Sequence, residues 1–136
     1  MHIKFVNPRM NSRPVDTQVK FRLLPPQSFI RLAAVTPAHH TLELADENLE
    51  DCDHDDRPDL VAITLFVATA RRGYDIADAY RARGVPVVVG GIHATCMPEE
   101  AKRHADMVVV GEGDELWPRL LADMERSESF TCAGSI

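Results

Sequence analysis

Cysteine is scarce in this chain, and its spacing excludes the commonest cysteine-based sites. Cys52, Cys96 and Cys132 lie far apart in 136 residues, with no CxxC pair and no Cys/His quartet. We therefore expect neither a cysteine-based structural zinc site nor a disulfide framework. An odd number of cysteines in a chain without a secretory signal is typical of reduced thiols.

Long apolar runs and basic clusters are also missing. The most apolar stretch, residues 60–70, is too short to cross a bilayer and contains two threonines. The first residues lack the layout of a secretory signal. The formal net charge is −6, and no segment carries a stripe of basic residues, which argues against nucleic-acid binding. We expect a cytoplasmic protein that binds neither a membrane nor nucleic acid.

Five short apolar runs that alternate with helical patterns predict an α/β fold. The runs cover residues 2–6, 41–45, 59–65, 86–89 and 107–110, and helical patterns cover 27–35, 70–83 and the stretch after Asp114, which could cap that last helix. This alternation predicts a parallel sheet with right-handed crossovers. We expect a flavodoxin-like three-layer sandwich with strand order 2-1-3-4-5. It would form one domain over residues 1–124, followed by a polar tail or linker at 125–136.

Two glycine-bearing loops follow neighbouring predicted strands and mark the expected ligand edge of the sheet. The run at 87–89 ends at Gly90-Gly91, from which a polar loop leads to a helix start at Pro98, and the run at 107–110 ends at Gly111-Glu112-Gly113. Ligands of α/β proteins bind at the carboxyl ends of the strands. With the expected strand order, this edge collects the following candidate ligand-binding residues: Asn7, Pro8, Thr64, Leu65, Phe66, Val67, Thr69, Gly90, Gly91, Ile92, His93, Ala94, Thr95, Gly111, Glu112 and Gly113.

Several well-known classes do not fit this edge. A response-regulator receiver needs acidic residues after its first and third strands and a lysine after its fifth, but Asn7-Pro8, Thr64 and Gly111-Glu112 stand there. The loop at 7–14 matches a flavodoxin phosphate loop only vaguely. No G-x-G-x-x-G follows the first strand and no P-loop motif is present. An edge rich in glycine and threonine and poor in acids and bases suits the binding of a large organic cofactor better than catalysis.

The two loops carry a family resemblance. The segments GGIHATCMPEE at 90–100 and ADMVVVGEGDE at 105–115 resemble the cobalamin-binding domain at the N-terminus of many radical S-adenosylmethionine enzymes. Asn7-Pro8, residues 24–27, Asp46-Glu47 and residues 58–64 stand in the order that the resemblance requires. The resemblance implies a domain that presents cobalamin to a neighbouring barrel, which binds a 4Fe-4S cluster through CxxxCxxC and uses S-adenosylmethionine. That motif is absent from the 136 residues, so we expect a fragment or a stand-alone domain that is not catalytic alone.

The resemblance also bears on the cobalt ligand. Cobalamin domains similar to that of methionine synthase supply an axial histidine from a DxHxxG motif, which this chain lacks. We therefore expect base-off cobalamin without a protein histidine on cobalt. The alternative function is a degenerate domain of the same fold that binds no cofactor and serves as a docking or scaffolding module.

Individual residues at the edge have competing interpretations. His93 could line the ligand or anchor its own turn, Thr95 could contact the cofactor or cap the helix at Pro98, and Glu112 could bind a cofactor hydroxyl or stabilise its loop. His39-His40 fit an ordinary surface connection. We expect Gly91→Trp to block ligand binding and to leave the fold largely intact.

Overall fold

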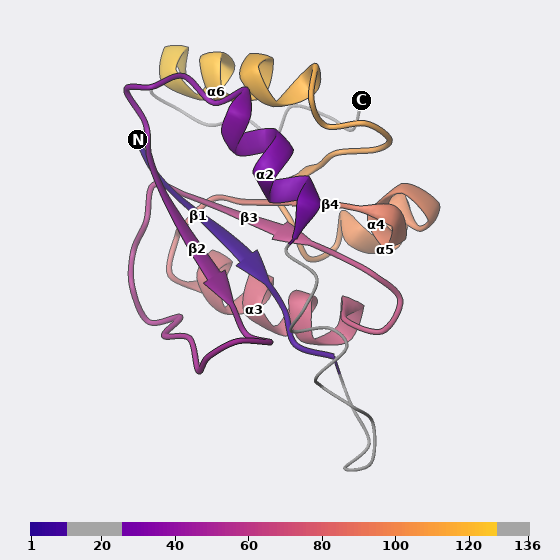
Figure 1. Ribbon diagram of the computed structural model, residues 1–136. Coiled ribbons are helices and arrows are strands. Elements are labelled where there is room, and N and C mark those ends of the chain that lie inside the picture. The colour runs from indigo at the N-terminus through magenta and orange to yellow at the C-terminus, as the bar shows by residue number, and fades with distance from the viewer. Residues whose placement is uncertain (11–25, 128–136) are drawn as a thin grey trace.

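The structure is a computed structural model that describes residues 1–10 and 26–127. Its centre is a five-stranded sheet in the order β2-β1-β3-β4-β5, with every neighbouring pair parallel (Figure 1). The strands are β1 (His2–Asn7), β2 (Thr41–Asp46), β3 (Leu60–Thr64), β4 (Val87–Gly90) and β5 (Met107–Val108). The predicted α/β class and strand order are confirmed. The order reverses between β1 and β3, the type of position at which ligands bind in such sheets.

Helices cover both faces of the sheet. On one face lie α2 (Gln27–Ala34) and α6 (Leu116–Arg126), and on the other lies α3 (Ala70–Ala82) (Figure 1). Two short helices, α4 (Ile92–Cys96) and α5 (Pro98–Ala101), connect β4 to β5. Each face has its own hydrophobic core: Phe29 and Trp117 belong to one, and Tyr74 and Tyr80 to the other. The molecule is therefore a three-layer sandwich.

Alternate residues of the central strands serve the two cores. In β3, Leu60 and Ala62 belong to the core under α2 and α6, whereas Val61 and Ile63 belong to the core under α3. Successive strand residues point to opposite faces. Since both faces are covered, the strand reads as a continuous apolar run, as the sequence indicated.

The helix predicted at 70–83 is confirmed as α3, and its residues Gly73, Ile76, Ala77 and Tyr80 form a buried side. Gly73 lies against Leu65: a Cβ atom placed on Gly73 would be 2.3 Å from Leu65 Cδ2. The helix therefore approaches the end of β3 more closely than any residue with a side chain would allow.

Two local expectations are corrected by the structure. The segment after Gly91 is not a loop but α4, which begins at once because the N–H of His93 donates to the carbonyl of Leu65 and that of Thr95 to the carbonyl of Gly91. Asp114 does not cap α6, since its carboxylate pairs with Arg31 of α2 instead.

The C-terminal tail predicted at 125–136 lies mainly outside the described residues, and α6 continues through Arg126. The polar loop predicted after Pro8 likewise falls mostly outside them. Within residues 1–10 and 26–127, no helix combines the length and the hydropathy that a bilayer crossing requires.

Candidate functional site

A pocket of about 140 Å³ lies at the carboxyl edge of the sheet, on the face covered by α2 and α6. Its floor is formed by Ala62 and Thr64 of β3 beside Val88 and Gly90 of β4. The strand register pairs Ala62 with Val88 and Thr64 with Gly90. All four positions face the same side, and the small residues Ala62 and Gly90 leave space above the sheet. The pocket is thus a consequence of residue size at alternate strand positions.

Aromatic side chains form the walls of this pocket and are held in place by other contacts. Phe29 of α2 stacks on Phe5 with 4.8 Å between ring centroids, and Trp117 of α6 lies 5.6 Å from the same ring. The indole N–H of Trp117 donates to Thr36 Oγ1 at 2.8 Å, so its polar atom has a partner. The walls are therefore preformed. A cavity of roughly 150 Å³ holds a benzene-sized ring in other proteins, so this volume suits one flat ring system.

Thr64 supplies the buried polar group of the pocket floor. The residue is only 4% exposed, and among the described residues its hydroxyl has no hydrogen-bond partner. The hydroxyl is therefore available to a ligand atom that accepts or donates a hydrogen bond. The pocket therefore combines apolar walls with one oriented polar group, as small-molecule sites commonly do.

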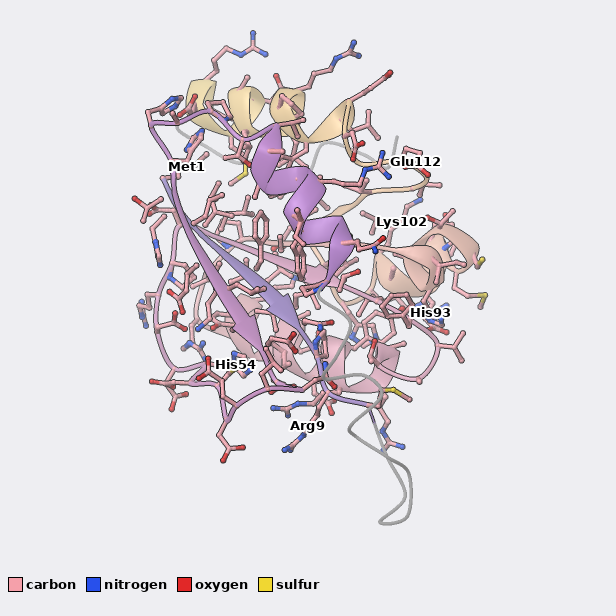
Figure 2. All side chains as sticks on the ribbon, viewed as in Figure 1. Met1, Arg9, His54, His93, Lys102 and Glu112 are labelled. Atoms are coloured by element: carbon pink, nitrogen blue, oxygen red, sulfur yellow. The ribbon has the colours of Figure 1, made fainter. Side chains whose placement is uncertain are left out.

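Charged side chains meet at the mouth of the pocket. Arg31 of α2 lies 3.2 Å from Glu112 and also pairs with Asp114, so it connects α2 to the loop between β5 and α6. Arg31 and Glu112 are exposed, and such pairs contribute little to stability. Figure 2 shows Glu112 near the start of α6, whereas His93, a residue of α4, lies at a different part of the edge. The polar side chains of the edge therefore divide between two regions.

Gly91 allows the backbone of β4 to turn tightly against β3. Its φ is +96°, and a Cβ atom there would be 2.8 Å from Leu65 O and 2.9 Å from Thr64 Oγ1. Any side chain would therefore collide with the strand itself as well as strain the backbone. The expectation that Gly91→Trp leaves the fold intact is wrong, because Gly91 is a structural requirement of the edge.

Thr95 connects the two glycine-bearing loops. Its hydroxyl donates to the carbonyl of Gly91 and accepts from the N–H of Gly111, each at 3.0 Å. Neither of the two earlier interpretations of this residue, cofactor contact or helix cap, describes these bonds. The hydroxyl holds the end of β4 and the loop after β5 at a fixed separation.

Some of the predicted ligand-binding residues line the pocket, and the others lie outside it. The predicted residues that line the pocket are Thr64, Gly90, Gly91, Gly111, Glu112 and Gly113. Three apolar predicted residues, Phe66, Val67 and Ile92, are exposed on the same edge outside the pocket. Six of the remaining seven are buried or have partners within the protein. Leu65 and Ala94 are fully buried, and Pro8 is buried. Asn7 donates to Asp46, Thr69 accepts from the N–H of Phe66, and His93 pairs with Glu100 at 3.0 Å. The seventh is Thr95, described above.

The sequence did not indicate the pocket-lining residues within the helices α2 and α6, nor most of those within the strands. The lining residues that it did not name as ligand-binding are Ser28, Phe29, Arg31, Leu32, Ala62, Ile63, Val88, Val109, Asp114 and Trp117. One signal was available, namely the small residues Ala62 and Gly90 on the same face of adjacent strands. The contribution of α2 depends on its packing against β1 and had no local signal.

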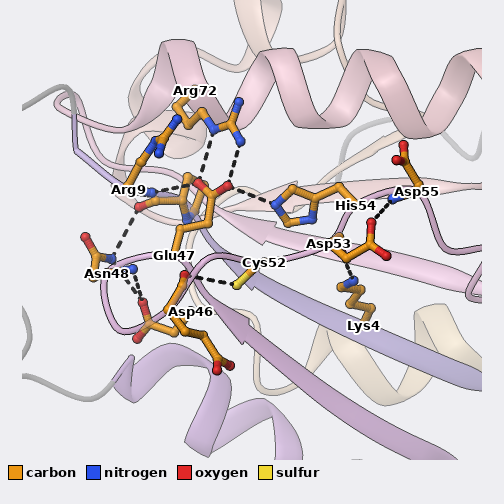
Figure 3. Close-up of polar contacts among 12 residues, drawn as sticks. Lys4, Arg9, Asp46, Glu47, Asn48, Cys52, Asp53, His54, Asp55 and Arg72 are labelled. Carbon is orange, nitrogen blue, oxygen red and sulfur yellow. Dashed lines mark hydrogen bonds and ion pairs between the residues drawn. The ribbon is translucent and has the colours of Figure 1, made fainter.

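A second polar cluster lies where β1 and β2 end (Figure 3). Glu47 accepts two hydrogen bonds from Arg72 of α3, at 2.7 and 3.1 Å, and a further contact from His54 at 2.9 Å. Burial alone would raise the pKa of Glu47, but the hydrogen bonds from His54, Arg72 and the N–H of Arg9 outweigh it and hold the pKa far below its usual range. Glu47 is therefore charged at neutral pH and connects β2, α3 and the loop after β1.

Comparison with known proteins identifies the family to which this edge belongs. The profile of the B12 binding domain matches residues 33–121. This range includes every residue that lines the pocket except those of α2. The chain belongs to the B12 binding domain family. Cobalamin is the ligand that this family implies.

The relatives are methyltransferases that are much longer than this chain. Bacteriochlorophyllide d C-8(2)-methyltransferase of Chlorobaculum tepidum is 48% identical over 94 residues, which are 68% of this chain and 21% of that protein. Bacteriochlorophyllide d C-12(1)-methyltransferase of the same organism is 31% identical over 105 residues, 76% of this chain and 23% of that protein. An uncharacterized methyltransferase of Synechocystis is 28% identical over 110 residues, 79% of this chain and 20% of that protein. The chain spans about a fifth of the length of the curated relatives it matches.

Proposed function

We propose that this chain binds cobalamin at the carboxyl edge of its sheet, with the ring of the nucleotide tail in the pocket between β3, β4, α2 and α6. The observation that carries the proposal is the pocket floor, where Thr64 and Gly90 lie side by side and the Thr64 hydroxyl has no partner among the described residues. The flat, partly polar ring of a nucleotide base matches a narrow apolar pocket with one hydroxyl. The matched family supports this choice of ligand.

Residues outside the pocket would contact the larger part of the cofactor. Phe66, Val67 and Ile92 present apolar surface at the same edge, with 52%, 81% and 61% of their areas exposed. A contiguous set of exposed apolar side chains indicates a surface that is covered in the functional state. Bound cobalamin supplies a cobalt centre that can carry a methyl group. The chain would hold and orient the cofactor through the pocket and this apolar rim.

No histidine of the described residues lines the pocket. His93, the histidine nearest to the glycine loops in sequence, has its Nε2 atom 3.0 Å from Glu100 and only 12% of its side chain exposed. This arrangement and the missing DxHxxG motif support base-off cobalamin without a protein histidine on cobalt. An electron paramagnetic resonance spectrum of the bound Co(II) form tests this point, since nitrogen coupling from a protein ligand would contradict it.

A longer protein that contains this domain would have an activity that the domain alone does not provide. The named relatives are methyltransferases, and this chain matches about a fifth of their length. We propose that the domain serves a cobalamin-dependent radical S-adenosylmethionine methyltransferase, in which a further domain would bind the 4Fe-4S cluster and S-adenosylmethionine. Transfer of a methyl group would then require that second domain as a partner.

The pocket can be tested with one substitution and one matched control. Gly90→Leu directs its side chain toward Val109 and into the pocket, and a Cβ atom at this position has an ordinary contact distance of 3.6 Å to Val109. Ala122→Leu places the same side chain on the exposed side of α6. We expect the chain and the Ala122→Leu variant to co-elute with hydroxocobalamin on gel filtration and to change its absorption spectrum. We expect Gly90→Leu to weaken binding about tenfold or more, equivalent to about 1.4 kcal/mol.

Circular dichroism and urea unfolding establish that the variants are folded. Binding by Gly90→Leu with unchanged affinity would place the site elsewhere. If neither this chain nor a longer protein that contains it retains cobalamin, the docking or scaffolding function becomes the better explanation.

A further inference from the structure

Three side chains with metal-binding atoms meet at the amino edge of the sheet, opposite the proposed cobalamin site. His39 and His40 belong to the loop between α2 and β2, which passes the last turns of α6 (Figure 1). His39 Nε2 is 2.7 Å and His40 Nε2 is 3.5 Å from the same oxygen of Glu125, near the end of α6. All three atoms lie within 4.8 Å of one another.

His40 is the central member of this group. Its side chain is completely buried, and its Nε2 atom has no hydrogen-bond partner among the described residues. The other ring nitrogen, Nδ1, lies 3.3 Å from the amino group of Met1, so Nε2 is the ring nitrogen that faces Glu125. A buried polar atom without a partner calls for a physical explanation. The atom points at Glu125, and a cation between the two would satisfy both.

We propose that His39, His40 and Glu125 bind a divalent transition-metal ion of the zinc type. Two imidazoles and one carboxylate are an established ligand set for Zn²⁺, with a fourth position left to water. Zinc–ligand distances of about 2.0–2.2 Å place neighbouring ligand atoms roughly 3.3–3.6 Å apart. His40 and Glu125 already have this separation. The ring of His39, with 60% of its side chain exposed, is free to rotate into position.

A metal ion here would connect α6 to the loop that leads into β2. Trp117 and Leu121 precede Glu125 by eight and four residues, so they lie on the same side of α6. They pack in the core beneath the helix, and Trp117 lines the cobalamin pocket. Fixing the C-terminal turns of α6 would therefore also fix one wall of that pocket. The inference stands on residues separate from the cobalamin site, so it does not depend on cobalamin binding.

Zinc binding to the 136-residue chain, prepared without a histidine tag and freed of metal with a chelator, tests the proposal. Isothermal titration with Zn²⁺ alone should show one site per chain, and thermal unfolding should shift upward in Zn²⁺ and return after chelation. Glu125→Gln and His40→Ala should each weaken the affinity about tenfold or more, equivalent to about 1.4 kcal/mol. The control is His104→Ala, which removes a histidine from a comparable surface pair with Asp78 and should leave zinc binding unchanged.

Since His40 is buried, its variant is interpreted only if circular dichroism shows a native fold, and Glu125→Gln carries the test otherwise. The proposal is overturned if no one-to-one binding occurs, if the Glu125 variant binds Zn²⁺ as the unmodified chain does, or if His104→Ala reduces binding to the same extent.

Discussion

The hydroxyl of Thr95 accepts a hydrogen bond from the backbone N–H of Gly111 at 3.0 Å, which joins the segments that follow β4 and β5. The same hydroxyl donates to the carbonyl of Gly91. One side chain therefore fixes the spacing between the two glycine-bearing segments that border the pocket. In the proposed binding mode this spacing would set the room for the ring of the nucleotide tail, and Thr95 would act as a positioning residue.

Replacing Thr95 with valine tests this relationship, because the shape is preserved and the hydroxyl is lost. We expect the free energy of unfolding to fall by about 0.5–1.5 kcal/mol, the usual net contribution of a hydrogen bond. Cobalamin affinity should fall as well, since the two segments lose their fixed spacing. Urea unfolding and cobalamin titration measure the two effects. Thr95→Ser keeps the hydroxyl and should stay near the unmodified chain, and a valine variant that equals the serine variant in both measurements would contradict the role.

Thr64→Val separates binding from stability in the pocket floor. Valine has nearly the same shape, and the hydroxyl it removes has no partner among the described residues, so we expect the free energy of unfolding to change by less than about 0.5 kcal/mol. Cobalamin affinity should fall roughly fivefold to tenfold, because the ligand loses a hydrogen bond worth about 1 kcal/mol. Thr64→Ser is the matched control. Equal affinities of the valine and serine variants would remove Thr64 from the proposed site.

The carboxylate of Glu47 should make stability depend on pH in acid. Its pKa is lowered in the folded chain, so its contribution is complete above the unfolded value of about 4.3 and is lost progressively as the pH falls below it. Glu47→Gln should cost about 1–3 kcal/mol at pH 7, because Arg72 and His54 lose a charged partner. The difference between the two proteins should shrink as the pH falls from 5 toward 2. Urea unfolding at several pH values measures this trend, and a constant difference would show that the charge is not the cause.

The contact between Gly73 and Leu65 can be tested with a double-mutant cycle. Gly73→Ala places a methyl group 2.3 Å from Leu65 Cδ2, so we expect destabilisation by about 1–3 kcal/mol from overpacking. In a Leu65→Ala background the space is free, and the same substitution should become neutral or stabilising by up to about 1 kcal/mol, the helix preference of alanine over glycine. Additive effects in the cycle would mean that the two residues do not interact.

The strands and the helix α3 were predictable because their signals are local. The apolar runs at 60–64 and 87–89 and the stripe from Gly73 to Tyr80 follow directly from periodicity. The helix α4 was missed because it depends on a carbonyl of β3: the N–H of His93 donates to Leu65, which is distant in sequence. No pattern within residues 91–96 contains that partner.

The site was predictable in place but not in composition. The glycines at 90, 91, 111 and 113 indicated the correct edge, and the pocket lies there. Which side chains face it depends on the pairing of Thr64 with Gly90 and on the contact of Phe29 with Phe5, both long-range features. The role of Thr95 required the position of Gly111, and that of His40 required the position of Glu125.

The floor of the pocket and the core on the other face of the sheet are formed by alternate residues of the same two strands, β3 and β4. Even-numbered residues of β3 and β4, Ala62, Thr64, Val88 and Gly90, face the ligand side, whereas the odd-numbered Val61, Ile63, Val87 and Val89 pack under α3. Inserting a single residue before Ile63 in β3 would turn Ile63 toward the ligand space and the Thr64 hydroxyl into the apolar layer, and an insertion before Val89 in β4 would turn Val89 toward the ligand space. Relatives that keep this site should therefore vary the lengths of their loops freely but conserve the lengths of these two strands.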